Sequence, residues 1–315
     1  MPATGSHQPN ILVLGGGGIL GEAWMSAVLA GLDEGGRFDS RACRLYLGTS
    51  AGSIVAASLA AGLAPGARLG ALPEQPAYPA SGPGAQGALR QGLGIAAGLG
   101  GAAAAPLASL ALSTTSVGGA LVRRAALRRV PRGQRSLAEL ASAVASSGAR
   151  WDGRLRVAAV ELDSGRRVIF GADGAPRASV AAAVQASCAI PGVFAPVAVG
   201  GRDYVDGGVW SPTNLDAAEA ERGESVVCLN PTGSLRPSIG SVAGAIGAVS
   251  RGAAATEALA LRHRGAEVTT IGPDDASTTA LGTNLMDGRR RAAVIEAGLA
   301  QGRRLASGSS VPAAA

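Results

Sequence analysis

The chain has 315 residues, of which 47% are apolar and 16% charged, so it is long enough to bury a large core and is not a disordered chain. All 28 basic residues are arginine, a bias that coding composition explains. The net charge of +6 is therefore only modest support for an anionic partner. We predict no nucleic-acid partner. Three widely spaced cysteines and two histidines argue against a metal site or a disulfide scaffold. The first ten residues lack the pattern of a secretory signal, so we expect a cytoplasmic protein, with peripheral contact to a membrane compatible with that location.

Short apolar strands alternate with helical segments along most of the chain, which predicts an α/β fold with a mostly parallel sheet sandwiched by helices. We treat residues 1–315 as a single domain of this kind. The expected strands are 11–14, 45–47, 155–161, 167–170, 225–229 and 267–271, with a further short apolar strand before Asp206. The expected helices are 21–33, 53–60, 137–146, 178–187, 214–222, 245–264 and 289–305, and residues 306–315 are an expected disordered tail.

Residues 65–135 interrupt this alternation. A loop rich in proline and glycine is followed by residues 91–122, which carry no charge, and then by six arginines between 123 and 135. We expect a helical insertion rich in Ala and Gly above the sheet, which either caps the active site or forms a surface that meets lipid. A buried helical hairpin remains an alternative, and so does a membrane span, although Pro106 and the many glycines argue against a span.

A sharp turn follows the second strand, at Gly48-Thr49-Ser50-Ala51-Gly52. The order strand, G-x-S-x-G, helix is typical of a nucleophile elbow, in which the flanking glycines let the backbone bend and expose the serine hydroxyl. Because 48 residues are glycine, such a motif also arises by chance, and its context must support it. We predict that Ser50 is a nucleophile, with Gly48 and Gly52 as supporting residues.

A nucleophilic serine needs a base, and neither histidine is well placed. His7 precedes the first strand, and His263 lies on a helix face that looks solvated. The best carboxylate is Asp206, which follows an apolar strand and precedes Gly207 and Gly208 in a sharp loop. An ordinary Asp-Gly turn is the alternative, and other carboxylates near a glycine compete with it: Asp163, Asp173 and Asp287.

A run of four glycines, Gly15, Gly16, Gly17 and Gly18, joins the first strand to the first helix. Unblocked amides at a helix N-terminus carry partial positive charge, so we predict that this loop forms an oxyanion hole. The pattern of Gly16, Gly18 and Gly21 also fits a dinucleotide-binding loop. That alternative expects an acidic residue ending the second strand, where this chain has Thr49 and Ser50.

Four segments together resemble the patatin-like phospholipase family. They are residues 14–18 with Gly21, residues 48–52, residues 186–196 and the Asp-Gly-Gly at 206–208, with a weaker likeness at 284–287. The likeness covers residues 10–62 and 154–230, and it does not extend to residues 63–153.

This resemblance implies a lipid acyl-ester hydrolase that uses a Ser–Asp dyad, without histidine, metal or cofactor. It implies Ser50 as nucleophile, Asp206 as base and the glycine loop as oxyanion hole. The chain departs from the family at Leu20, where Arg or Lys is often found, which puts a preference for phospholipid headgroups in doubt. Asn214 follows Asp-Gly-Gly later than in the family and is expected only as a loop anchor. A catalytically silent scaffold of the same fold and a nucleotide-binding protein remain the alternatives.

Overall fold

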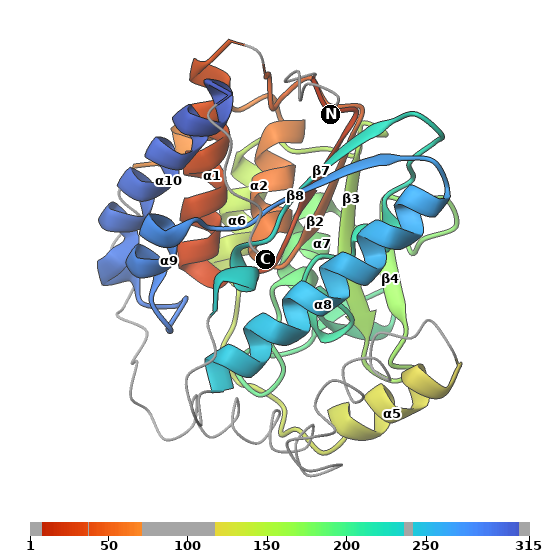
Figure 1. The fold of residues 1–315 in the computed structure, drawn as a ribbon. Helices are drawn as coiled ribbons and strands as arrows, with labels where there is room; N and C mark the ends of the chain where they lie inside the picture. Colours follow the sequence, from red (N-terminus) through yellow and green to blue (C-terminus); the bar gives the residue numbers. More distant parts are fainter. Residues whose placement is uncertain (1–7, 37, 71–116, 236–241, 309–315) are drawn as a thin grey trace.

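A computed structural model describes residues 8–36, 38–70, 117–235 and 242–308. Its centre is one eight-stranded sheet (Figure 1), in the order β5-β6-β3-β2-β1-β7-β8, with β4 paired to β3. The strands are β1 Ile11–Leu14, β2 Leu45–Thr49, β3 Leu155–Glu161, β4 Arg167–Phe170, β5 Val197–Val199, β6 Arg202–Asp206, β7 Ser225–Leu229 and β8 Glu267–Ile271.

Helices cover both faces of this sheet (Figure 1). Side chains alternate along β1, so Leu12 and Leu14 enter one apolar core while Ile11 and Val13 enter the other. The first core takes in α1, α2, α6, α7, α9 and α10, and the second is closed by α8. The helices are α1 Gly18–Glu34, α2 Ala51–Ala60, α5 Val117–Leu127, α6 Ala138–Ser146, α7 Val180–Ser187, α8 Val242–His263, α9 Asp275–Leu281 and α10 Arg291–Ala306.

The pairing of β3 brings two distant parts of the chain together. One edge of β3 pairs with β4, and the other pairs first with β2, in parallel, and then with β6, in antiparallel orientation. Thr49, the last residue of β2, pairs with Ala158, and Asp206, the last residue of β6, pairs with the next residue, Ala159. The two strands therefore meet end to end along one edge, which places Ser50 beside Asp206.

The predicted fold class is confirmed. Strands β1–β2, β2–β3, β1–β7 and β7–β8 pair in parallel, and only the end of the sheet that contains β4, β5 and β6 is antiparallel. The prediction of a helix at 214–222 is wrong. Only a single 3₁₀ turn, Leu215–Ala217, forms there, because Asn214 adopts a left-handed conformation and Glu257 binds the amide of Leu215.

Two elements are absent from the sequence-based prediction: the three-residue strand β5 and the short helix α9. Most of the expected cap, residues 71–116, and most of the expected tail, residues 309–315, lie outside the described residues. The described parts of the cap region include a 3₁₀ turn at Pro65–Arg68 and helix α5. Among the described helices, none has the length and apolar character that crossing a bilayer requires.

Candidate active site

Ser50 lies in a strained turn between β2 and α2. Its φ of 51° and ψ of −122° place it in a region that residues other than glycine rarely adopt. The flanking glycines permit the turn, since a Cβ atom on Gly48 would lie 2.4 Å from Ser53 Cα. A Cβ atom on Gly52 would lie 2.0 Å from the carbonyl oxygen of Leu14. Strand, helix and glycines thus hold the Ser50 side chain at the carboxyl edge of the sheet.

Asp206 is the hydrogen-bond partner of this serine. Ser50 Oγ lies 2.7 Å from Asp206 Oδ2, while Asp206 Oδ1 accepts a hydrogen bond from the amide of Gly208 at 2.7 Å. Asp206 is buried, with 6% of the residue exposed. Burial raises the pKa of Asp206 to about 6, against the opposing effect of the hydrogen bonds from Ser50 and Gly208. A carboxylate with such a pKa is suited to accept a proton near neutral pH.

The C-terminal end of α7 and the loop that follows it fix both members of this pair. The amide of Ser50 donates to Ser187 Oγ at 2.8 Å, and that hydroxyl donates to the carbonyl of Ala158 at 2.6 Å. The amide of Asp206 donates to the carbonyl of Ala189 at 3.0 Å. Sequence reasoning gave Ser187 no role, although it lies in the segment 186–196 that carries the family resemblance.

The glycine loop lies against the serine, but its four amides differ in their contacts. The amide of Gly15 donates to Leu229 O and that of Gly16 to Pro212 O, at 2.9 and 2.8 Å, so both hold the loop in place. The prediction that all four glycines supply oxyanion donors is therefore corrected for Gly15 and Gly16. Within the described chain, the amides of Gly17 and Gly18 at the N-terminus of α1 have no backbone hydrogen-bond acceptor.

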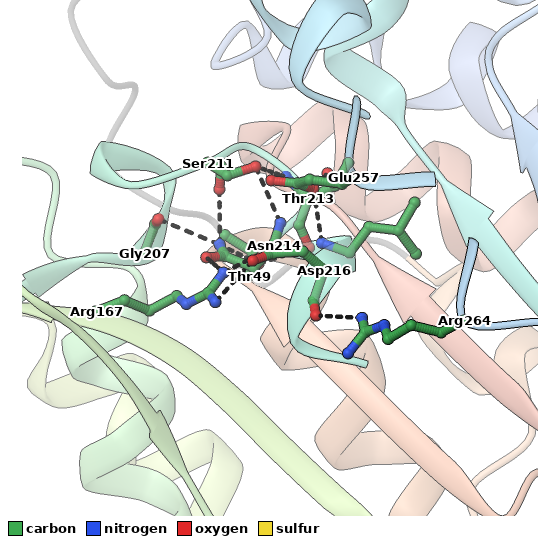
Figure 2. Close-up of polar contacts among 10 residues, drawn as sticks. Thr49, Arg167, Gly207, Ser211, Thr213, Asn214, Asp216, Glu257 and Arg264 are labelled. Atoms are coloured by element: carbon green, nitrogen blue, oxygen red, sulfur yellow. Dashed lines mark hydrogen bonds and ion pairs between the residues drawn. The ribbon is translucent and has the colours of Figure 1, made fainter. Parts of the chain in front are cut away.

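A buried polar network joins the turn at Ser50 to the loop after Asp206 (Figure 2). Its centre is Asn214, whose Nδ2 lies 3.1 Å from Thr49 Oγ1, 3.3 Å from Gly207 O and 2.7 Å from Ser211 O. Asn214 and Ser50 are the two residues other than glycine with positive φ in the described chain. The expected loop anchor therefore bridges the residues that precede the serine and follow the aspartate.

Glu257 of α8 closes the other side of this network. Its Oε2 accepts hydrogen bonds from Thr213 Oγ1 at 2.6 Å and from the amide of Leu215 at 2.8 Å. Burial raises the pKa of Glu257, and the charge of Asp216 acts in the same direction. Because these bonds hold the backbone on both sides of Asn214, Glu257 stabilises the left-handed turn.

We expect Asn214→Ala to lower the free energy of unfolding by about 3 kcal/mol, because buried partners lose their hydrogen bonds and alanine is strained at φ 51°. Asn214→Gly loses the same bonds without the strain and should be more stable than the alanine variant by about 1 kcal/mol. Both variants should lose activity, since the network positions the serine and the aspartate. Urea denaturation and kcat/KM for a soluble ester check this, and a loss below about 1 kcal/mol in both variants would contradict it.

The competing residues do not contact this pair in the described structure. His263 ends α8 at the amino edge of the sheet, and His7 lies outside the described residues. Asp163 and Asp173 are exposed in turns, and Asp287 pairs with Arg289. In the described part of the chain, no cluster of three or more His, Cys, Asp or Glu residues could hold a metal ion. Strand β2 ends at Thr49 without the acidic residue that a dinucleotide site expects.

Comparison with known proteins assigns the family. No curated protein matches the chain. Among solved structures, the crystal structure of VipD from Legionella pneumophila is similar at 17% sequence identity and a TM-score of 0.42, covering 97% of this chain and 67% of that chain. The model of the family described as patatin-like phospholipase matches residues 12–219, more than half of the chain. The protein therefore belongs to the patatin-like phospholipase family, which implies lipid acyl hydrolase activity in general terms.

Proposed function

We propose that this protein hydrolyses acyl esters of lipids, with Ser50 as nucleophile and Asp206 as general base. The observation that supports this most directly is the 2.7 Å contact between the hydroxyl of a serine in a strained elbow and a buried carboxyl group. The contact of Gly208 with Oδ1 leaves Oδ2 facing the serine, so the geometry favours proton transfer between these two atoms.

In the first half of the proposed reaction, Asp206 accepts the Ser50 proton as Oγ bonds to the ester carbonyl carbon. The carbonyl oxygen becomes negative, and the amides of Gly17 and Gly18 with the N-terminus of α1 stabilise it. Collapse of this intermediate breaks the ester bond, and Asp206 returns its proton to the departing alcohol. The acyl group is then bonded to Ser50.

In the second half, water repeats these steps. Asp206 takes a proton from water, the hydroxide adds to the acyl carbon, and the oxyanion binds at the same amides. Collapse releases the fatty acid, and the proton on Asp206 returns to Ser50 Oγ. No metal or further cofactor takes part in these steps.

The test is covalent labelling with a fluorophosphonate, which reacts with activated serines. We expect the wild-type protein to form an adduct at Ser50, identified by mass spectrometry of the digested protein. Ser50→Ala should form none, and Ser53→Ala, which removes the next hydroxyl along the chain, in the first turn of α2, should retain the adduct. A folded wild-type protein that is unlabelled and inert to acyl esters would favour the catalytically silent scaffold.

Activity should fall as the pH is lowered through about 6, because only the ionised form of Asp206 can accept the serine proton and its pKa is raised to about 6 by burial. At pH 5 we expect kcat/KM about tenfold below its plateau, since one proton controls the change. Measuring kcat/KM for a soluble ester between about pH 4.5 and 8 checks this. A plateau that extends down to about pH 4 would show that Asp206 is not the base.

A further inference from the structure

The excess positive charge of this protein is concentrated in one short segment. Residues 117–135, here called the arginine segment, contain six arginines and no acidic residue: Arg123, Arg124, Arg128, Arg129, Arg132 and Arg135. The whole chain has 28 basic and 22 acidic residues, so the rest of it holds 22 of each. The net charge of +6 is therefore a local property of this segment and not a general feature of the surface.

The arginine segment is attached at the carboxyl edge of the sheet, where Ser50 and Asp206 lie. Arg123 Nε donates to the carbonyl of Gly165, in the turn after β3, at 2.8 Å. Its guanidinium lies 3.8 Å from the ring centroid of Trp210, four residues after Asp206. The amide of Ala195 donates to the carbonyl of Arg135 at 2.9 Å. Figure 1 shows α5 beyond the carboxyl end of β3.

The outer side of this segment combines charge with apolar surface. Arg128, Arg129, Arg132 and Arg135 are exposed. Arg132 pairs with Asp203 at 3.0 Å but remains 72% exposed, and no described acidic residue pairs with Arg128 or Arg129. Leu121, on helix α5, which precedes these arginines, is 56% exposed.

A cavity of about 210 Å³ is lined in part by Arg128 and Arg132. Its walls include Leu127, Leu162, Phe194 and Val205, and Asp163 contributes one acidic group to its lining. Two arginines and several apolar side chains lining one cavity match a molecule with an anionic head and an apolar body. The arginine segment thus offers exposed charge at residues 128–135, after α5, and an exposed apolar side chain on α5 itself.

We propose that the arginine segment docks this protein on an anionic lipid surface, with the carboxyl edge of the sheet toward the lipid. Basic residues near an anionic bilayer each contribute attraction, and an exposed leucine can enter the interfacial region. A nucleic acid fits less well, because residues 117–135 contain no aromatic side chain to stack on bases. The proposal rests on the proposed function only in that a lipid hydrolase must reach lipid.

The test uses Ser50→Ala protein, so that lipid is not consumed, and measures sedimentation with vesicles. The vesicles contain phosphatidylcholine alone, or phosphatidylcholine with about a third phosphatidylglycerol. We expect binding to the anionic vesicles only, weakened by added salt. Adding Arg128→Ala and Arg129→Ala should lower the vesicle affinity about 30-fold. The matched control, Arg177→Ala with Arg222→Ala, removes the same charge from exposed positions near the amino edge and should bind like its parent.

Three results would overturn the proposal. They are no binding to anionic vesicles, equal losses of vesicle affinity in the Arg128→Ala/Arg129→Ala variant and the control variant, or tighter binding to a DNA duplex than to the vesicles. Thermal unfolding of each variant shows whether a loss reflects unfolding. The outcome is independent of the dyad, because vesicle binding is measured without turnover. If the protein hydrolyses a soluble ester but does not bind vesicles, the docking surface alone is overturned. If it binds vesicles but shows neither hydrolysis nor fluorophosphonate labelling, the proposed function alone is overturned.

Discussion

Asp206→Asn should lower kcat/KM for a soluble acyl ester by about 10³- to 10⁴-fold while the protein stays folded. The amide of asparagine cannot accept a proton from Ser50, so the nucleophile loses its base. The geometry should survive, because the asparagine oxygen can accept from the Gly208 amide and its NH₂ group can donate to Ser50 Oγ. The expected loss therefore reports the missing proton acceptor and not a displaced loop.

The same substitution should stabilise the fold above pH 6. Burial raises the pKa of Asp206 from 3.8 to about 6, so the folded state binds the Asp206 proton more tightly than the unfolded state does. The wild-type protein consequently loses stability as the pH rises from about 4 to about 6, and ionising the buried group costs about 3 kcal/mol in total. Asparagine does not ionise, so the variant should gain up to about that amount over the wild type at pH 7 and almost nothing at pH 4.

Urea denaturation at both pH values and kcat/KM at the activity plateau check the two halves of this prediction. Asp173→Asn is the matched control, since Asp173 is exposed in a turn and should change neither quantity. If Asp206→Asn keeps near wild-type activity, the base is another group. If it is less stable than the wild type at pH 7, the buried carboxylate contributes to the fold through contacts that asparagine cannot replace.

The elements could be predicted from the sequence because their signals are local. Each predicted strand is a short apolar run that ends in a turn, and these runs form strands in the structure. Strand β5 also has a local sequence signal, the pair Gly200-Gly201 that follows it. In the structure both glycines have positive φ and join β5 to β6 in a two-residue hairpin. The Ala- and Glu-rich segment 214–222 has helical propensity, which tertiary contacts to Asn214 and Glu257 override.

The pairing of Ser50 with Asp206 could not be predicted from periodicity. It depends on β6 following β2 along the same edge of β3, and the register of such long-range pairs is not encoded in either strand alone. The family resemblance supplied that pair. The different hydrogen bonding of the four glycine amides was equally inaccessible, because it depends on the carbonyls of Leu229 and Pro212, about 200 residues away in the chain.

The two glycines of the elbow differ in what they permit, and Gly52 is the more demanding position. A Cβ atom there would lie 2.0 Å from Leu14 O, 2.4 Å from Leu14 C and 2.8 Å from Gly15 O, all backbone atoms at the end of β1. No side chain can move aside to make room. Helix α2 would have to separate from the start of the glycine loop, which carries the proposed oxyanion donors.

We therefore expect Gly52→Ala to lower the free energy of unfolding by at least about 3 kcal/mol and to reduce the activity of whatever protein still folds. Gly252→Ala is the matched control. Gly252 lies in α8, and a Cβ atom there would have no neighbouring atom within 4 Å, so alanine should add up to about 1 kcal/mol of stability through helix propensity. Urea denaturation of the two variants should give changes of opposite sign. A Gly52→Ala protein as stable as the wild type would mean that α2 and the end of β1 can separate freely, and the close packing of the elbow against the glycine loop would then not be what holds Ser50 in place.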